Sequence, residues 1–379
     1  MTNNIFGIVC EFNPFHNGHH YLLQKAKELG AQKIVLAMSG NFVQRGEPAA
    51  FDDRKRAKWA LENGGDLVVK IPVCHCLASA QFYAQSAVFL LKSADCTHLF
   101  FGSESGDIDA LCRSAKIVDS PAFADEFRRL TDEGLSYPRA RQQALEILGG
   151  DPEHLRGPNN ILALEYIVAC QKYRLTPVTV PRLGVGHHDL QASENIASAS
   201  AIRQMLRQGD VQSAVKYMPC GDVLEAHTEI DPKMLDRTLL SAVLLADDET
   251  LNAIPFCENG LGGALKNNLP GCETVDQLVE KCTNNRVTAA RVRRALWCLL
   301  LGIKKEDVTS LPHYLYVLGA TQNGSGLLKD TSLPVVTSLV KIKEERFAVL
   351  EAKATDVYGA CTQQILPKGQ EFRKKFVIL

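Results

Sequence analysis

The sequence predicts an α/β protein in which a doubly wound parallel sheet is followed by a mainly helical region. Up to Asp210, apolar segments typical of buried strands alternate with helical segments, which favours parallel strands joined by right-handed crossovers. After Asp210 the pattern is almost entirely helical. A chain of 379 residues with 46% hydrophobic side chains is long enough for two domains. We therefore expect one domain at residues 1–210 and a second at 211–379.

The spacing of apolar residues places each element. Strands are predicted at 5–12, 33–40, 66–72, 98–104 and 177–183, with helices at 18–29, 54–62, 78–92, 108–118, 121–133, 138–148, 160–173 and 200–208. In the second half, helices are predicted at 235–245, 275–282, 288–301 and 343–365, with one strand candidate at 313–320. The glycine-rich segment 260–265 has no phosphate-binding context and is interpreted as a turn.

Composition excludes several classes of protein. The net charge of -1 gives no global attraction to nucleic acid, so we expect no DNA partner, and any RNA contact requires a local basic patch. The 12 cysteines are scattered, which favours reduced thiols and a cytoplasmic location. No signal peptide is visible at the N-terminus, and the longest apolar run, 295–303, is too short to cross a bilayer. No membrane partner is expected.

The segment FNPFHNGHHYLL, residues 12–23, places His16 and His19 on either side of Gly18, between the first strand and the first helix. Doubly wound sheets bind ligands beyond the carboxyl ends of their strands. The free N–H groups at a helix start favour an anion, and an imidazole can donate a hydrogen bond to a phosphate oxygen. The position therefore indicates a phosphate site, although the motif alone leaves a metal-binding pair or two surface histidines open.

HNGH resembles the HxGH signature of the nucleotidyltransferase superfamily. Proteins of that superfamily carry a second phosphate motif, ISSTxIR, and this chain has IASASAIR at 196–203. Ser198 and Ser200 can cap the helix that follows and present hydroxyl and backbone N–H groups to phosphates, and Arg203 lies in its first turn. Taken alone, this segment reads as an ordinary helix cap with a surface arginine. Paired with HNGH, it favours a second phosphate contact.

Several longer blocks resemble the tRNA(Met) cytidine acetate ligase family. They are GIVCEFNPFHNGHHYLL, MSGNFVQRGEPA, FFGSE, GPNNILALEY and IASASAIR, followed in the second half by RVTAARVRRALWCLLLGI, YLYVLGA, LPVVT and EFRKKFVIL. The resemblance covers nearly the whole chain. It implies an enzyme that activates acetate with ATP as acetyl-adenylate and transfers the acetyl group to the wobble cytidine of elongator tRNA(Met). Two departures are a missing lysine near Asp53, which Arg54 or Lys55 could replace, and Ala163 in place of a glycine.

The resemblance also implies roles for individual residues. His16 and His19 are the expected catalytic residues, and Arg45 and Glu47 are candidates for shaping the acetate or cytidine pocket, with Glu104 a weaker candidate for orienting an amine. One of Asn159 and Asn160 is expected to contact the nucleotide. The full set expected to bind ATP is Gly7, Ile8, Val9, Cys10, Glu11, Phe12, Asn13, Pro14, Phe15, His16, Asn17, Gly18, His19, His20, Gly102, Asn159, Asn160, Arg182, Ser198, Ser200 and Arg203.

Adenylation usually needs a divalent cation, but no cluster of carboxylates in the sequence indicates a metal site made of protein side chains. We expect Mg²⁺ to be held mainly by ATP. The sequence Cys74-His75-Cys76 is too tightly spaced for zinc and has no second pair of ligands. For tRNA, the expected contacts are basic residues of the helix at 288–301, of the segment before it and of the C-terminal tail: Arg286, Arg291, Arg294 and Lys374.

Two other functions use parts of the same sequence. A small-molecule nucleotidyltransferase of cofactor metabolism would share the HxGH chemistry, although it would not need the helical half with its arginines. A non-catalytic RNA-binding protein could keep the fold, although it would have no reason to keep both phosphate motifs. The sequence thus favours the acetate ligase and leaves acyl selectivity, the choice of tRNA and oligomeric state undetermined.

Overall fold

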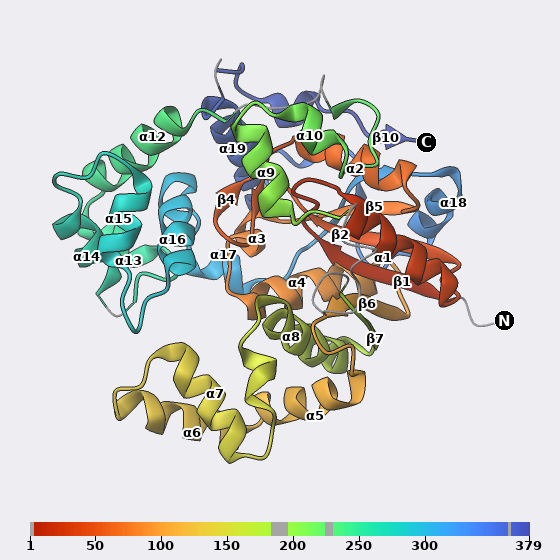
Figure 1. Ribbon diagram of the computed structural model, residues 1–379. Coiled ribbons are helices and arrows are strands. Elements are labelled where there is room, and N and C mark those ends of the chain that lie inside the picture. Colours follow the sequence, from red (N-terminus) through yellow and green to blue (C-terminus); the bar gives the residue numbers. More distant parts are fainter. Residues whose placement is uncertain (1–3, 183–195, 224–229, 259, 363–364) are drawn as a thin grey trace.

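The computed structural model describes residues 4–182, 196–223, 230–258, 260–362 and 365–379, and it has a sheet of eight strands at its centre (Figure 1). Along the sheet the order is β10-β8-β5-β2-β1-β6-β7, with β9 beside β8. The α/β fold class predicted from the sequence is confirmed. The strands are β1 (Ile5–Cys10), β2 (Lys33–Ser39), β5 (Leu67–Ile71), β6 (His98–Ser103), β7 (Thr176–Pro181), β8 (Leu315–Ala320), β9 (Val335–Val336) and β10 (Val377–Ile378).

The five strands that the first half contributes to this sheet are parallel, and their order sets the position of the ligand site. From β1 the chain adds β2 and β5 on one side and then crosses to add β6 and β7 on the other. The reversal leaves a crevice beyond the carboxyl ends of β1 and β6, which is where open α/β sheets bind ligands. Of the predicted strand at 177–183, Leu183 lies outside the described residues.

Helices cover both faces of the sheet because side chains alternate along each strand. Phe6 and Leu36 point to the face covered by α1 (Asn17–Glu28) and α2 (Asp53–Glu62), in one core cluster. Val35 and Val69 point to the opposite face, covered by α4 (Ala80–Ser93) and α8 (Pro158–Tyr173), in a second cluster. The sheet is therefore buried on both sides, as parallel sheets require.

Two further groups of helices are set off from the sheet (Figure 1). Between β6 and α8, the chain forms α5 (Ile108–Val118), α6 (Pro121–Asp132), α7 (Tyr137–Ile147) and the 3₁₀ turn η1 (Pro152–Leu155). The second group is α12 (Pro232–Leu245), α13 (Asp248–Ala253), α14 (Leu261–Asn268), α15 (Val275–Cys282) and α16 (Ala289–Leu301). Outside these two groups lie the long helix α19 (Arg346–Ala360) and shorter helices and turns. The shorter ones are α3 (Val73–Cys76), α9 (Ala199–Arg207), α10 (Val211–Val215), α17 (Lys305–Thr309), α18 (Gln322–Ser325), η3 (Gly326–Lys329), η4 (Leu339–Ile342) and η5 (Gln370–Arg373).

The division expected near Asp210 does not separate the sheet from the helices. β8 and β10, which come from the second half, extend the sheet beyond β5, and β8 runs antiparallel to β5. All six residues of β8 are buried, so this apolar strand covers an edge that β5 would otherwise leave open. The turn predicted at 260–265 was wrong, because helix α14 begins at Leu261 and buries the side chains of Leu261 and Leu265.

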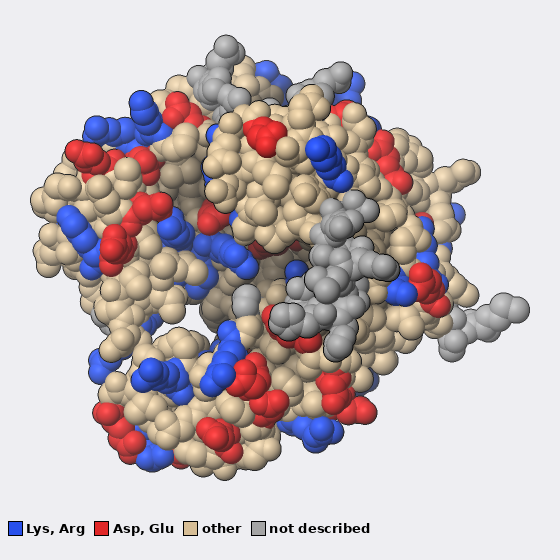
Figure 2. Space-filling view, in the orientation of Figure 1, with Lys and Arg blue, Asp and Glu red and all other residues tan. Residues whose placement is uncertain are grey.

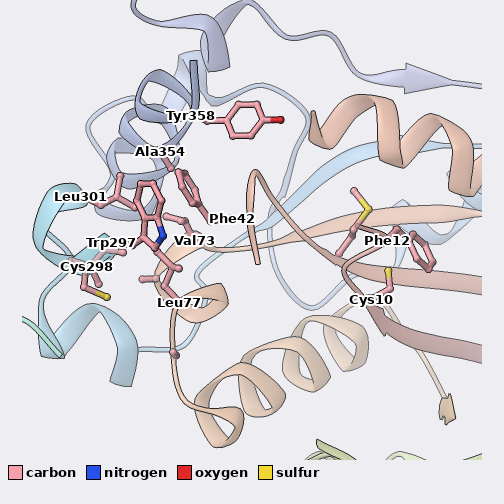
Figure 3. Packing of buried hydrophobic residues seen from close by; sticks show 14 of the residues in the cluster. Cys10, Phe12, Phe42, Val73, Leu77, Trp297, Cys298, Leu301, Ala354 and Tyr358 are labelled. Carbon is pink, nitrogen blue, oxygen red and sulfur yellow. The ribbon is translucent and has the colours of Figure 1, made fainter. Parts of the chain in front are cut away.

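Trp297 of helix α16, in the second half of the chain, packs against the first half (Figure 3). The indole of Trp297 packs on the ring of Phe42, with centroids 4.6 Å apart, and its Nε1–H donates to the carbonyl of Gly46 at 2.9 Å. Phe42 and Gly46 belong to the hairpin of β3 (Phe42–Val43) and β4 (Glu47–Pro48) that follows β2. Tyr358 of α19 donates to the carbonyl of Ala49 at 2.9 Å. The Trp297 contacts hold α16, and the Tyr358 contact holds α19, against the segment that follows β2.

A buried cluster of charges ties the C-terminal segment to the sheet. Lys70 of β5 lies 2.7 Å from carboxylate oxygens of both Asp53 and Glu351 and 3.4 Å from Glu371. Burial alone lowers the pKa of the Lys70 ammonium, but the three carboxylates, Asp53 foremost, raise it well above its ordinary value. Lys70 is therefore a structural cation, and its loss would leave buried carboxylates without this cationic partner.

The structure gives Lys374 a different role from the tRNA contact predicted for it. Its ammonium lies 2.7 Å from Asp53 and also pairs with Asp52, with its side chain largely buried. An ammonium held by carboxylates inside the fold is not free to bind phosphate. Of the two residues that could replace a lysine near Asp53 in the sequence, Lys55 pairs with Asp222 at 2.6 Å, and Arg54 lies 3.9 Å from Asp53 and 3.7 Å from Glu371.

Within the described ranges, no helix has both the length and the apolar character needed to cross a membrane.

Replacing Lys70 with methionine tests the buried cluster. Because the variant leaves carboxylates buried without their shared cation, we expect the free energy of unfolding to fall by about 3–5 kcal/mol, measured by chemical denaturation. Lys25→Met is the control, since the Lys25–Glu28 pair is solvent-exposed and its removal should change the free energy of unfolding far less than the loss of Lys70 does. Similar losses in the two variants would contradict a structural role for Lys70.

Candidate active site

The HNGH segment folds back on the start of α1. His16 is the N-cap residue, and its Nδ1 accepts a hydrogen bond from the backbone N–H of Gly18 at 3.0 Å. The Nδ1 of His19 accepts in turn from the backbone N–H of His16 at 3.3 Å, and the two rings stack with centroids 3.7 Å apart. A neutral imidazole that accepts at Nδ1 carries its proton on Nε2. Both histidines are therefore set to donate from Nε2.

Burial keeps both rings neutral. Burial, followed by the nearby charge of Arg182, lowers the pKa of His16 to about 4. The pKa of His19 lies well below its ordinary value, again through burial first and then through His16 and Arg182. At neutral pH the pair thus acts as two hydrogen-bond donors rather than as two cations.

Gly18 is required because of the imidazole above it. A Cβ atom at this position would lie 2.9 Å from Cε1 of His16 and 3.8 Å from Cγ2 of Ile196. Ile196 begins the IASASAIR segment, so the two motifs meet at this glycine. The close approach explains why the motif needs a residue without a side chain between its histidines.

Arg203 joins the two phosphate motifs. Its guanidinium donates to the backbone carbonyl of Asn13 at 2.8 Å and to the hydroxyl of Ser200 at 3.3 Å. Ser198 caps α9, accepting from the N–H of Ala201 at 3.2 Å. The Nε of Arg203 is buried and has no hydrogen-bond partner among the described residues. The first turns of α1 and α9 therefore line one cavity. The N–H groups at the start of α1 are already bonded to Tyr217 and His16, so the donors left for an anion are the two imidazoles, the Arg203 guanidinium and the start of α9.

A third set of polar groups lies at the ends of β6 and β7. Arg182 donates to Oδ1 of Asn159 at 3.0 Å, and Nδ2 of Asn159 donates to Glu104 at 3.0 Å. A Cβ at Gly102 would lie 3.0 Å from Cγ of Arg182, so this glycine makes room for the arginine. Asn160 instead accepts from the backbone N–H of Glu104 and is buried, so Asn159 is the asparagine that faces the open space.

These groups line one cavity of about 1320 Å³. Its wall includes eight of the residues predicted between Gly7 and His20, which are Val9, Cys10, Glu11, Phe12, Asn13, His16, Gly18 and His19. Gly102, Asn159, Arg182, Ser198, Ser200 and Arg203 also line it, as do Arg45 and Glu47. Two phosphate motifs and the strand ends thus meet where the sequence placed a single site.

Seven residues of the expected ATP-binding set do not line this cavity: Gly7, Ile8, Pro14, Phe15, Asn17, His20 and Asn160. Gly7 has another purpose, because a Cβ there would lie 2.8 Å from Leu91 and push α4 away from β1. Ile8 and Phe15 are core residues, and the N–H of Asn17 donates to the carbonyl of Tyr217. The sequence motif is continuous, but only part of it faces the cavity.

Three of the four residues predicted to bind tRNA line the far side of the same cavity. Arg286, Arg291 and Arg294 face it from α16 and the segment before it, and Lys374 does not. Figure 2 shows Lys and Arg side chains gathered around the hollow at the centre of this face. Arg291 donates to the backbone carbonyl of Phe256 at 2.8 Å, so its guanidinium is held in place.

Sequence reasoning missed part of the cavity wall. Tyr137, Arg141 and Glu165 line it from α7 and α8, and Gln44 lines it from the β3–β4 hairpin. Gln44 and Glu165 lie in the MSGNFVQRGEPA and GPNNILALEY blocks but carry no predicted role, whereas Tyr137 and Arg141 lie outside every block and reach the cavity through the packing of α7. Across the described part of the chain, no three His, Cys, Asp or Glu side chains are grouped closely enough to hold a metal ion.

Comparison with known proteins agrees with this geometry. A family model described as HIGH nucleotidyl transferase matches residues 3–373. The chain belongs to this family. A tRNA(Met) cytidine acetate ligase of Clostridium perfringens is 34% identical over 94% of this chain and 95% of its own length, and one of Acetivibrio thermocellus is 32% identical over 99% and 100%. The family resemblance inferred from the sequence is thereby confirmed.

Two solved structures of Thermotoga maritima TmcAL share the fold of this HIGH nucleotidyl transferase. The form bound with α-thio ATP is 27% identical with a TM-score of 0.87, and an apo form is 28% identical with a TM-score of 0.90. Each match covers 99% of this chain and 99% of the other.

The low pKa of His16 predicts a pH effect on stability. Unfolding returns the ring to a pKa near its ordinary value, so the unfolded chain binds a proton first as the pH falls. The stabilisation is complete above about pH 6.5 and is lost as the pH falls towards about 4. Between pH 7 and 4, we expect the free energy of unfolding of the unaltered protein to fall by up to about 3 kcal/mol more than that of His16→Gln.

Denaturant titrations at several pH values measure this difference. Parallel pH profiles for the two proteins would show that His16 is not held neutral by the fold.

Proposed function

We propose that this chain is an ATP-dependent ligase that acetylates N4 of the wobble cytidine in elongator tRNA(Met). The observation that carries the proposal is the contact between Arg203 and the carbonyl of Asn13, which brings both phosphate motifs to one cavity. Acetate, ATP and the tRNA are the substrates. The identity to tRNA(Met) cytidine acetate ligases over nearly the full length of both chains supports the choice of acyl and RNA substrates.

The first step makes acetyl-adenylate. A carboxylate oxygen of acetate attacks the α-phosphorus of ATP, the bond between the α-phosphorus and the bridging oxygen breaks, and pyrophosphate leaves. His16 and His19 donate hydrogen bonds to phosphate oxygens from neutral Nε2–H groups. The α9 N-terminus with Arg203 receives the departing pyrophosphate, and Arg182 lies across the cavity as a further cation. Fixed donors of this kind act without reorganising during the reaction.

The second step transfers the acetyl group. The N4 amine of the cytidine attacks the acetyl carbonyl carbon, the bond to the adenylate oxygen breaks, AMP leaves, and the nitrogen loses a proton to give N4-acetylcytidine. Because activation has already supplied the driving force, the protein's main task is to position the amine. Arg45 and Glu47, on the hairpin beside the histidines, are the candidates for shaping this part of the site.

Mg²⁺ would neutralise charge on the triphosphate and is expected to arrive bound to ATP. The carboxylates of Glu11 and Glu47 line the cavity, but Glu11 accepts from the N–H of Gln44 at 2.8 Å and Glu47 lies 3.8 Å from Arg203. These engagements fit a cation held mainly by phosphate oxygens. The cytoplasm, where tRNA is modified, is the expected location.

The arginines across the cavity are assigned to tRNA. Arg286 is exposed and Arg291 half-buried at the N-terminal end of α16, where they would meet the phosphates of an anticodon loop. A protein of net charge -1 that binds RNA through a local strip should have a moderate affinity that falls with added salt.

One experiment tests the function directly. The protein is incubated with labelled acetate, ATP, Mg²⁺ and total tRNA, and the tRNA is digested to nucleosides. We expect the label in N4-acetylcytidine from elongator tRNA(Met). Pyrophosphate exchange that responds to phosphopantetheine or nicotinamide mononucleotide, and not to acetate, would instead identify a small-molecule nucleotidyltransferase.

Replacing His16 or His19 with alanine tests the phosphate site. Because each ring supplies a fixed donor to charge that develops on phosphate, we expect acetate-dependent ATP–pyrophosphate exchange to fall by about 100-fold or more, with tRNA affinity little changed. His313→Ala is the matched control, since that exposed histidine lies outside the cavity. Full exchange activity in the His16 and His19 variants would refute the assignment.

A further inference from the structure

The cavity continues past the phosphate motifs into a space that the nucleotide site does not explain. Its volume of about 1320 Å³ exceeds the roughly 300–1,000 Å³ of an ordinary small-molecule pocket. The additional wall runs from α7 and α8 to α16, and four of its residues carry the polar chemistry. We call Tyr137, Arg141, Glu165 and Arg294 the α7–α16 subsite.

Arg294 is a buried cation without a carboxylate partner among the described residues. It is 9% exposed, its NH1 group makes one long hydrogen bond of 3.4 Å to the carbonyl of Gln44, and its Nε has no partner there. Burial lowers the pKa of this guanidinium to about 10. A desolvated cation of this kind is costly unless an anion joins it. Its guanidinium carbon lies 5.5 Å from the ring centroid of Phe256, and the residue lines the cavity, so an anionic group of a ligand bound there would meet a cation without a carboxylate partner.

Tyr137 offers an aromatic surface on the same wall. It is 46% exposed, with Phe127 packed edge-on at 5.3 Å between ring centroids and the Arg141 guanidinium 6.0 Å from its own centroid. Its backbone N–H donates to the carbonyl of Asn285 at 3.2 Å, which joins the start of α7 to the segment before α16. A supported, exposed ring beside an arginine is a common stacking platform for unpaired RNA bases.

Arg141 and Glu165 form a largely buried ion pair that lines the cavity. The NH2 group of Arg141 lies 3.1 Å from Oε1 of Glu165, with side-chain exposures of 15% and 10%. Pairs on the outer surface of the same helical group are far more exposed, such as Arg128–Asp125 at 70% and 74%. Among the described residues, the second carboxylate oxygen of Glu165 has no hydrogen-bond partner, which leaves it able to accept from a ligand.

This pair matches the hydrogen-bonding edge of cytosine. The base presents an N4 amine that donates and N3 and O2 atoms that accept, and a carboxylate is the usual acceptor for the N4 amine. Glu165 lines the same cavity as His16, His19 and Arg182. A base held at this pair would therefore share one cavity with the nucleotide.

We propose that the α7–α16 subsite holds one flipped-out cytidine of the RNA substrate. The Tyr137 ring stacks on the base, the Arg141–Glu165 pair binds its donor and acceptor edge, and Arg294 binds its phosphate. The inference rests on the proposed function, since it names the residues that select the acceptor nucleotide. It also gives a purpose to the α5–α7 group, which forms one wall of the subsite.

Glu165→Gln tests the base contact while keeping size and an acceptor for Arg141. The substrates are tRNA(Met) transcripts with cytidine or uridine at the wobble position. We expect kcat/KM for acetyl transfer to the cytidine transcript to fall by about 10- to 100-fold, because a carboxylate contact to the N4 amine discriminates on this scale. The uridine transcript, used as a competitor, should bind the unaltered protein more weakly than the cytidine transcript, and this preference should shrink in Glu165→Gln.

Acetate-dependent ATP–pyrophosphate exchange, which needs no RNA, distinguishes a damaged nucleotide site from a lost contact to the base. Normal exchange in Glu165→Gln would show that the nucleotide site is folded. Glu126→Gln is the matched control, because the Glu126–Arg129 pair lies on the outer surface of α6 and does not line the cavity. Unchanged transfer and unchanged base preference in Glu165→Gln would overturn the subsite. Absence of exchange in the unaltered protein would overturn the proposed function and the subsite with it.

Tyr137 provides a second, independent variant. Tyr137→Phe keeps the stacking surface and should retain transfer, whereas Tyr137→Ala should raise the KM for tRNA by about tenfold, as expected for the loss of one stacked base. Equal KM values for the two variants would contradict stacking on this ring.

Discussion

The whole site depends on the packing of α9 against the loop that follows β1. Arg203 reaches a carbonyl 190 positions earlier in the chain, and Ile196 lies against Gly18 in the same region. With this contact in place, two helix N-termini and two neutral imidazoles face the same space. Without it, each motif would be an isolated helix cap, and neither alone offers enough donors for a triphosphate.

The second half of the chain matters because it closes the other side of this space. Trp297 and Tyr358 donate to carbonyls of the segment after β2, and the Lys70 cluster anchors the C-terminal segment on β5. The arginines of α16 are therefore held in position across the cavity from the phosphate motifs. One cavity can then hold both an activated acyl group and the nucleotide that receives it, which is the geometry a two-step ligase requires.

Local signals predicted much of this structure. Apolar runs located the first-half strands, and HNGH with IASASAIR located the two sides of the phosphate site. The partners of individual side chains could not be predicted where those partners lie far away in the sequence. Lys374 sits in a basic tail that suggests RNA binding, but its partner Asp53 is 321 positions away. Arg141 lies outside the blocks that resemble the family, so its pairing with Glu165 could not be inferred from them, and the Gly7 requirement comes from Leu91 of helix α4.

The most direct test is a crystal structure of this protein with a non-hydrolysable ATP analogue. The account predicts the triphosphate between the N-termini of α1 and α9, within hydrogen-bond distance of the Nε2 atoms of His16 and His19 and of the Arg203 guanidinium. Density for the nucleotide elsewhere, with these three side chains contacting only protein or water, would contradict it.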